Sequence, residues 1–232
     1  MILCDNVSFS YDGENKILSD LNLELKSGLA LLLGPNGCGK TTLLRLAAGV
    51  EMADSDRILI NGADLWQDEI AARSKLVYLP EYPDLTPYAK IKEILDLVCR
   101  LRGEPIQRGE EALRETGLLH LMHRTVRELS GGQRRRVIFA CCMVGRATVI
   151  LLDEPLEGMD AQMQQKILSW LKERVEDGST ILLASHIFHP FLPWTDQAVT
   201  IRDGRAVHLK DLPRDKEQKR LFLENLAGGE LV

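Results

Sequence analysis

Long apolar runs are missing from this sequence. The longest candidates span residues 29–33, 137–144 and 181–184, whereas a helix that crosses a bilayer needs roughly 20 apolar residues. The first ten residues alternate like a strand and lack a basic start followed by an apolar stretch, so they do not resemble a secretion signal. We therefore expect a soluble protein whose membrane role, if it has one, comes through a partner chain.

An excess of positive charge is missing too. The chain has 29 Lys and Arg against 34 Asp and Glu, which gives a net charge of −5. Its isoelectric point is about 5.6. A protein whose main task is to coat nucleic acid usually needs a basic face. The composition therefore predicts no nucleic-acid partner.

Paired cysteine motifs are also absent. There are five cysteines, an odd number, and no Cys-x-x-Cys pair. Cys141 and Cys142 lie in an apolar stretch and are expected in the core. This usage is typical of a reducing cytosol. His120 and His123 have a spacing that occurs in metal sites, but no third ligand accompanies them, and we expect a structural role for both.

Short, solid apolar runs indicate the architecture. Four of them have the composition of strands buried on both faces of a sheet, at residues 29–33, 76–79, 149–152 and 181–184. Helical segments lie between them, and this alternation predicts an α/β domain with a mostly parallel sheet. Residues 58–60 and 198–207 are predicted to be strands of a smaller antiparallel sheet. Residues 214–225 are predicted to form a charged helix.

The middle of the chain breaks this rhythm. Its apolar residues recur at helical spacing, as at Ile91, Leu95 and Val98, which predicts a helical lobe inserted into the α/β core. We expect one domain over residues 1–232. Its parts are the α/β core with the antiparallel subdomain at about 1–83 and 146–210, the helical lobe at about 84–145, and the C-terminal helix and tail at 211–232.

A glycine-rich loop follows the first of these buried strands. Gly34, Gly39, Lys40 and Thr41 fit the pattern G-x-x-x-x-G-K-[ST], with a strand before it and a predicted helix after it. Glycines let the backbone curl so that several N–H groups point at one anion, and the helix adds its positive N-terminal end. In such loops the lysine reaches the β- and γ-phosphates and the threonine hydroxyl ligates Mg²⁺. The loop predicts nucleotide binding on a P-loop NTPase core.

Two carboxylates follow a later buried strand. Residues 149–152 lead directly into Asp153 and Glu154. An apolar strand that ends in a carboxylate is the second half of a phosphate-loop site. Asp153 is predicted to hold Mg²⁺, and Glu154 to polarise the water that attacks the γ-phosphate. General-base help of this kind contributes about 10²- to 10⁴-fold in rate.

A third motif lies between these two. Ser130 is a good helix N-cap and precedes Gly131, Gly132 and Gln133 at the start of a predicted helix. Two glycines at a helix start expose N–H groups for a second anion site. A compact chain would have trouble closing both anion sites on one nucleotide. Two chains placed head to tail would solve this, because each would supply its serine-glycine turn to the other's ATP.

With these motifs the sequence resembles the nucleotide-binding subunits of ATP-binding cassette (ABC) transporters over nearly its whole length. The resemblance implies that ATP is contacted by Tyr11, Gly34, Pro35, Asn36, Gly37, Cys38, Gly39, Lys40, Thr41, Thr42, Glu81, Ser130, Gly131, Gly132, Gln133, Asp153 and Asp160. It implies catalytic roles for Lys40, Glu154 and His186, and magnesium ligation by Thr41, Asp153 and Glu81. The simpler alternatives are a plain strand aromatic at Tyr11 and a hydrogen-bonded strand-end residue at His186.

Two departures from the family pattern stand out. After the strand at 76–79 the family usually has a glutamine that contacts Mg²⁺ and the water, and Glu81 takes that place here. Its oxygen can still ligate a hard cation, so we expect a tuned site and not a dead one. In the loop that touches the partner protomer, Leu156 and Glu157 replace small hydroxyl or amide residues, while Asp160 is present.

The resemblance implies an ATP-hydrolysing subunit of an ABC transporter that uses ATP and Mg²⁺. We expect a homodimer or a heterodimer with a second nucleotide-binding subunit, bound to integral membrane permease subunits on separate chains. Such a protein is peripheral on the cytoplasmic face of the membrane. The alternatives are a soluble ABC ATPase, such as an iron–sulfur assembly type, and a nucleotide-binding regulator that does not hydrolyse ATP. Selectivity lies in the membrane subunits, so the sequence predicts no substrate.

Overall fold

The chain divides into two compact units. The computed structural model describes residues 1–82 and 84–230, without the side chains of residues 55 and 56. The first unit consists of Met1–Tyr78, Ala147–Pro155 and Leu171–Val232, and the second of Leu79–Arg146 and Leu156–Trp170. The helical stretch expected at 84–145 lies in the second unit, which also takes in Leu156–Trp170.

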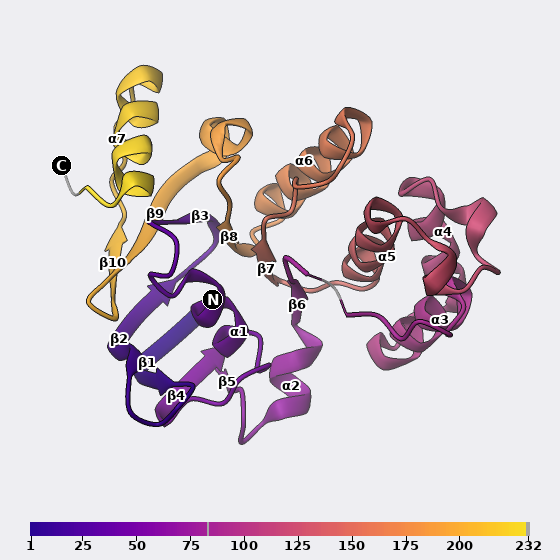
Figure 1. Ribbon diagram of the computed structural model, residues 1–232, viewed down its shortest axis with the longest axis horizontal. Helices are drawn as coiled ribbons and strands as arrows, with labels where there is room; N and C mark the ends of the chain where they lie inside the picture. The colour runs from indigo at the N-terminus through magenta and orange to yellow at the C-terminus, as the bar shows by residue number, and fades with distance from the viewer. Residues whose placement is uncertain (83, 231–232) are drawn as a thin grey trace. The chain divides into compact units, whose positions relative to one another are not determined.

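The main sheet has six strands in the order β10-β9-β3-β8-β7-β6 (Figure 1). Their bounds are β3 Gly28–Leu33, β6 Leu76–Leu79, β7 Val149–Asp153, β8 Thr180–Ala184, β9 Thr195–Arg202 and β10 Arg205–Leu209. Strand β3 runs parallel to both β8 and β9, and β7 runs parallel to β8. All residues of β7 and β8 are buried, as expected for central strands covered on both faces. The four predicted apolar strands and the α/β class are confirmed.

Residues 198–207 form strands, as predicted, but the prediction that they belong to the smaller antiparallel sheet was wrong. These residues form the β9–β10 hairpin of the main sheet, where Thr200 of β9 lies opposite Leu33 of β3 in parallel register. Asp203 and Gly204 turn the hairpin with positive φ angles of 47° and 75°, which suits the twist of paired strands. The local sequence pattern is that of an antiparallel pair of strands. The pairing of β9 with β3, which is distant in the sequence, determines that the hairpin belongs to the main sheet.

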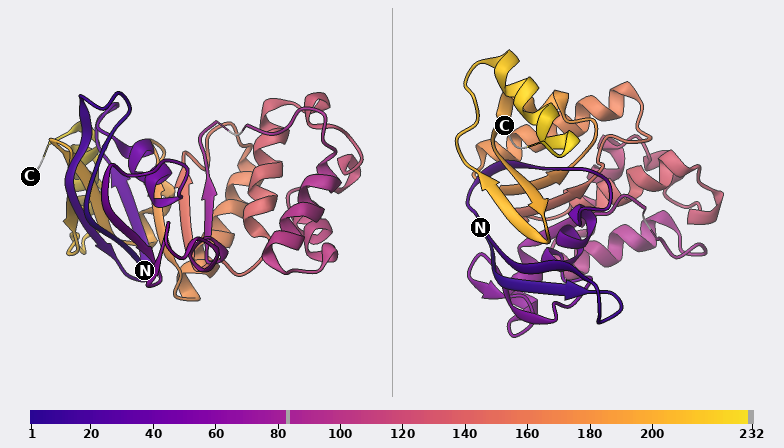
Figure 2. Two further views of the ribbon diagram at one scale, coloured as in Figure 1. Left: turned by 90° about the horizontal axis from the view of Figure 1, so that it is seen from below. Right: turned by 60° about the vertical axis from the view of Figure 1, so that its left-hand side comes forward.

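A second sheet of four strands is entirely antiparallel. Its order is β2-β1-β4-β5, from β1 Ile2–Ser10, β2 Lys16–Leu25, β4 Ser55–Ile60 and β5 Ala63–Asp64. The strand predicted at 58–60 is thus confirmed in β4. Helix α1, Lys40–Ala47, buries Leu43, Leu44 and Leu46 in one core with residues of both sheets. Figure 2 shows the strands and helices of the chain from two further sides. This core fixes the loop between β3 and α1, because both of its ends are anchored in it.

Further helices complete the first unit. Helix α2 is Glu69–Ser74, the short 3₁₀ segment η3 is His189–Trp194, and α7 is Lys216–Gly228. Asp215 caps α7 by accepting hydrogen bonds from the backbone N–H groups of Glu217 and Gln218. Helix α7 contacts η3 and β3. Helix α6, Ala161–Glu176, continues from the second unit into the first.

The second unit is helical and has its own core. It contains α3 Ile91–Arg102, α4 Ile106–Glu115, α5 Gly131–Met143 and the 3₁₀ segments η1 Leu119–Leu121 and η2 Val126–Glu128. Ile91, Leu95 and Val137 are fully or nearly fully buried in its core, and the Phe139 ring meets the Trp170 ring edge to face. Cys142 is also buried here, and desolvation raises the pKa of its thiol to about 12. It is therefore a packing residue, as predicted.

Among the helices of residues 1–82 and 84–230, none combines the length and apolar character that crossing a bilayer requires. Within the same residues, no group of three or more His, Cys, Asp and Glu side chains is arranged to hold a metal ion. His120 lies in η1 and His123 follows it, both on the surface.

Candidate functional site

The glycine-rich loop has a backbone that only glycine accepts at its first position. Gly34 follows β3 with φ 143°, in the left-handed region. A Cβ there would lie 3.0 Å from the Cys38 Sγ and 3.3 Å from the Thr200 Oγ1. Gly39, with φ 109°, forms the N-cap of α1. The curl is therefore set by glycines at both ends, as an anion cradle of backbone N–H groups requires.

Lys40 lies at the start of α1 and points back into this loop. Its Nζ donates to the carbonyl oxygens of Gly34, at 2.7 Å, and Pro35, at 3.0 Å. The first turn of α1 has no acidic residue, so the positive helix end and the ammonium group act together on the loop. The loop thus concentrates positive charge and N–H donors, which is the chemistry that a polyphosphate needs.

Thr41 and Asp153 meet across the first unit. The Thr41 hydroxyl donates to Asp153 Oδ2 at 2.7 Å. Asp153 ends β7 and is 3% exposed. A hydroxyl and a carboxylate held this close supply the oxygen ligands that Mg²⁺ prefers. These two residues fit the predicted metal site.

Glu154 has an unusual backbone conformation. Its φ of 49° is in the left-handed region, which costs a non-glycine residue about 1 kcal/mol or more. Its buried carboxylate accepts from the Ser185 hydroxyl and from the backbone N–H of His186, both at 2.8 Å. The His186 Nε2 lies 3.8 Å from Glu154 Oε1, and the His186 ring is largely exposed. The two donors fix the carboxylate at the end of β7.

Ser185 was missed from sequence. It is 4% exposed, and its Oγ also accepts from the Ile187 N–H at 3.0 Å. A serine beside a predicted site histidine was the one available signal. The hydroxyl holds both the Glu154 carboxylate and the start of the loop that carries His186, so it positions the two predicted catalytic groups.

Sheet order explains why these residues come together. Strands β3, β8 and β7 are neighbours and run parallel, so their C-terminal ends lie along one edge of the sheet (Figure 1). Gly34 follows β3, His186 lies two residues after β8, and Asp153 ends β7. In open α/β sheets, ligands bind at this edge. The first unit therefore gathers the loop, the Thr41–Asp153 pair and the Glu154–His186 pair.

Tyr11 belongs to the same unit and lies one residue beyond β1. The residue is 58% exposed, and its ring meets the Phe9 ring edge to face, with centroids 4.8 Å apart. The edge-to-face contact with Phe9 therefore orients the Tyr11 ring, while most of the Tyr11 surface stays accessible to solvent. An accessible aromatic face is what stacking on a base needs, and the adenine contact stays a prediction.

The serine-glycine motif begins α5 in the second unit. The Ser130 Oγ accepts from the Gln133 N–H at 3.3 Å, and Gln133 Oε1 accepts from the Ser130 N–H at 3.0 Å, forming a capping box. A Cβ at Gly131 would meet nothing within 4 Å, whereas one at Gly132 would lie 3.3 Å from the Gly158 carbonyl. Packing within the unit therefore explains Gly132 but does not require glycine at position 131, where the backbone is left open.

The loop predicted to touch a partner protomer is tied to α5 within the same unit. Asp160 accepts from the Met163 N–H at 2.9 Å at the start of α6 and pairs with Arg136. Glu157 is exposed and lies 4.0 Å from Arg135. The loop is thus held by two arginines of α5. A nucleotide contact by Asp160 remains a prediction.

Glu81 and Tyr82 follow β6 in the second unit. A hydrogen bond to the Glu81 carboxylate, with that group's negative charge, raises the pKa of the Tyr82 phenol. Tyr82 is 79% exposed. Thr41 and Asp153 belong to the first unit, so Glu81 as a third magnesium ligand stays a prediction.

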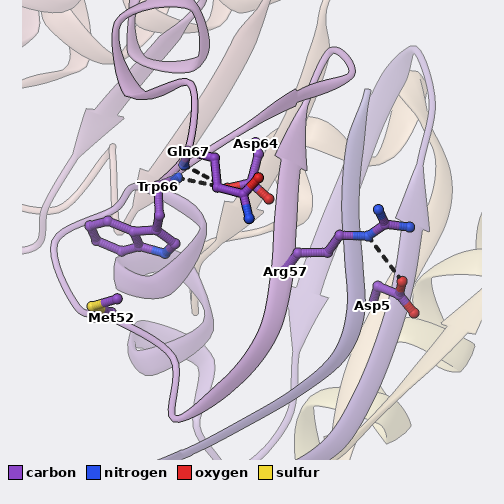
Figure 3. Close-up of a pocket in the computed structure, with 6 residues that line it drawn as sticks. All are labelled: Asp5, Met52, Arg57, Asp64, Trp66 and Gln67. Carbon is purple, nitrogen blue, oxygen red and sulfur yellow. Dashed lines mark hydrogen bonds and ion pairs between the residues drawn. The ribbon is translucent and has the colours of Figure 1, made fainter.

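A pocket of about 480 Å³ lies elsewhere, at the antiparallel sheet (Figure 3). Arg57 of β4 and Asp5 of β1 form an ion pair at 3.2 Å on one side of it. Asp64 of β5 accepts from the backbone N–H groups of Trp66 and Gln67 on the other. Met52 completes its lining. Its lining residues include none of the nucleotide-binding, catalytic or metal-binding residues predicted from the sequence.

Comparison with known proteins identifies the family. The ABC transporter family model matches residues 18–157, more than half of the chain. The Fe(3+) ions import ATP-binding protein FbpC of Vibrio cholerae is 32% identical over 223 residues, covering 93% of this chain and 63% of the relative. The spermidine/putrescine import ATP-binding protein PotA of Mesoplasma florum is 35% identical over 231 residues, covering 96% and 65%. The chain thus spans just under two thirds of the length of these relatives.

Solved structures agree on the fold. An ATP-binding subunit of an ABC transporter superposes with a TM-score of 0.83 at 24% identity, covering 96% of this chain and 94% of that one. A dimeric ATP-binding cassette in a post-hydrolysis state with ADP and Pi gives a TM-score of 0.80 at 24% identity, covering 90% and 98%. The predicted family and fold are confirmed: this chain belongs to the ABC transporter family.

Proposed function

We propose that this chain binds ATP with Mg²⁺ and hydrolyses it to ADP and phosphate. The observation that carries the proposal is the edge shared by β3, β8 and β7, which gathers the Lys40 loop, the Thr41–Asp153 pair and the Glu154–His186 pair in one unit. The named relatives, FbpC and PotA, are ATP-binding proteins. An anion cradle beside oxygen ligands and a fixed carboxylate suits phosphoryl transfer to water.

Each residue has a distinct role in this proposal. Lys40 exchanges its contacts with the Gly34 and Pro35 carbonyls for the β- and γ-phosphate oxygens, while the loop N–H groups hold the phosphate chain. Thr41 and Asp153 hold Mg²⁺, whose charge offsets that of the phosphates. Glu154 accepts a proton from the attacking water. His186, held by its N–H to Glu154, contacts the γ-phosphate with its exposed ring.

The signature at Ser130 belongs to the second unit and is proposed to serve a partner's ATP. The bare backbone at Gly131 supports this reading, because nothing within its own unit fills that space. The capping box leaves the first turn of α5 pre-formed for an anion. We infer a head-to-tail dimer with an identical or a different nucleotide-binding subunit, in which ATP binding closes the dimer and hydrolysis reopens it.

The membrane role is proposed from the relatives. FbpC and PotA are named as import ATP-binding proteins, which favours a transporter subunit over a soluble ABC ATPase of the iron–sulfur assembly type. We propose that this chain drives permease subunits on separate chains from the cytoplasmic face of the membrane. Purification of the tagged chain from its native membranes should recover a multi-span membrane protein. Recovery of soluble partners alone would favour the soluble class.

The enzymatic proposal has a direct test. Purified chain, alone and with its membrane partner, should release phosphate from ATP with Mg²⁺, and chelating Mg²⁺ with EDTA should stop the release. Equilibrium binding of a fluorescent ATP analogue should be competed by ATP. Binding without any phosphate release, even with the partner present, would support the regulator that does not hydrolyse.

Glu81→Gln should retain ATPase activity, within about threefold of the unchanged chain. The amide keeps an oxygen that can ligate a hard cation, and it removes the negative charge of a residue to which the family resemblance assigns a contact with Mg²⁺. Phosphate release by the variant, measured at saturating Mg-ATP, checks this. Complete loss of activity would mean that Glu81 is indispensable as a carboxylate. Glu93→Gln on α3 is the control for the same chemical change at a helix-capping position of the same unit.

A further inference from the structure

The residue that follows α7 lies beside the phosphate loop. Gly229 follows α7 with φ 91°, and a Cβ built on it would lie 3.5 Å from both Cγ and Cδ of the Pro35 ring. The Gly229 N–H bonds the Leu226 carbonyl at 3.1 Å, and the Glu230 N–H bonds the Asn225 carbonyl at 2.8 Å. This is a Schellman C-cap, so the backbone that reaches Pro35 is a defined structure.

Arg202 ties this helix end to the main sheet. Its guanidinium donates to the Gly229 carbonyl at 2.6 Å from the last residue of β9. Two residues earlier on the same strand, Thr200 lies next to Gly34, with its Oγ1 3.3 Å from where a Gly34 Cβ would be. Strand β9 therefore reaches both of the loop's first residues, because Thr200 lies next to Gly34 and Arg202 bonds Gly229, which lies beside Pro35.

The same two residues are held from within the loop by Lys40. Its Nζ binds the carbonyls of both Gly34 and Pro35. When Lys40 turns to a phosphate, as in the function proposed above, those two internal contacts are given up. The outer support from Arg202 and Gly229 does not depend on Lys40, so it persists through that exchange.

We propose that Arg202 and Gly229 form a clamp that positions Pro35, and with it the anion cradle, for nucleotide binding. The inference rests on the proposed function, because the cradle is taken to hold ATP. Arg202 and Gly229 are positioning residues, because Arg202 bonds the Gly229 carbonyl and Gly229 lies beside Pro35 of the loop. A pre-organised loop avoids the loss of affinity that follows when the binding-competent conformation is only partly populated.

The clamp makes a specific kinetic prediction. Arg202→Met removes the guanidinium donors but keeps a long side chain, and it should raise the Kd for Mg-ATP by about 3- to 10-fold through a lower population of the competent loop. The kcat at saturating ATP should change less than twofold, because the catalytic groups are untouched. Arg202→Lys, which retains a donor, should recover most of the affinity. Helix α7 stays docked in these variants, because Leu223 and Leu226 are buried and Lys219 bonds the Thr195 carbonyl at 3.0 Å.

Matched controls exist for both halves of the clamp. Arg205→Met makes the same change on β10, where the side chain is 68% exposed and 3.7 Å from Asp20; it should leave the Kd unchanged. Gly229→Ala puts a side chain on a residue with φ 91°, which strains the C-cap that Arg202 bonds, and should raise the Kd. Gly228→Ala adds a methyl group at the preceding residue, where a Cβ would meet nothing within 4 Å. This variant should leave the Kd for Mg-ATP unchanged.

A readout without nucleotide separates the clamp from the proposed function. Hydrogen–deuterium exchange of peptides that cover residues 34–39 should speed up in Arg202→Met and Gly229→Ala, and not in the two controls. Unchanged exchange together with a Kd within twofold of the unchanged chain, in variants that keep their circular dichroism spectrum, would overturn the clamp. Failure of the unchanged chain to bind Mg-ATP would instead overturn the proposed function, whatever the exchange rates show.

Discussion

Glu154→Gln is expected to lower steady-state ATP turnover by about 10²- to 10⁴-fold, the usual contribution of a general base, while ATP binding is retained. The amide has the shape of the carboxylate and can keep its place. Its oxygen accepts from the His186 N–H, and its NH₂ donates to the Ser185 hydroxyl, which rotates to accept. These are the two contacts that fix the carboxylate at 2.8 Å in the unchanged chain. What the variant loses is the ability to take a proton from water.

The variant should also trap a closed dimer, because ATP that is bound and not hydrolysed holds the two chains together. Phosphate release gives the rate, and size-exclusion chromatography with light scattering in Mg-ATP gives the dimer. Glu176→Gln is a control for the same chemical change on an exposed residue of α6, where the carboxylate pairs with Lys172 at 3.8 Å. Turnover equal to that of the unchanged chain would show that Glu154 is not the base.

The buried strands and helix starts were predictable because their causes are local. Strands at the centre of a parallel sheet are apolar on both faces. Residues 149–152 and 181–184 can therefore be predicted as buried strands from their own composition, without knowing which strands pair with them. Ser130 likewise indicates where α5 begins, because it forms a capping box with Gln133. The phosphate loop could be predicted for the same reason, because the positive φ angles at Gly34 and Gly39 require glycine at those positions.

Features that depend on distant partners were not predictable. The hairpin of β9 and β10 has the local pattern of an antiparallel pair, and its membership of the main sheet follows from the parallel pairing of β9 with β3. Ser185 is one polar residue after a strand, and its role appears when β8 and β7 lie side by side. Gly229 and Pro35 lie side by side although they are far apart in the sequence, and no periodicity in the sequence predicts this.

Complementation between two inactive variants should restore activity if each ATP site is shared between two chains. Gly131→Asp places a carboxylate at the open start of α5, where a Cβ meets nothing within 4 Å, so the fold should be unaffected. Its charge opposes a bound phosphate, and loss of such an anion-stabilising position lowers turnover by about 10²-fold or more. Lys40→Ala disables the phosphate loop. Each variant alone should therefore be nearly inactive as a homodimer.

An equal mixture of the two variants, dissociated and reassembled, should regain about a quarter of the unchanged activity. Half of the dimers are then mixed, and each mixed dimer has one site with both defects and one site with none. Lys40→Ala mixed with Asp153→Asn is the decisive control, because both changes fall in the same half-site and every dimer keeps a defect in each site. Recovery in the first mixture alone would establish that Gly131 acts on the partner's nucleotide. Equal inactivity of both mixtures would mean that the loop and the signature do not complete each other across a dimer.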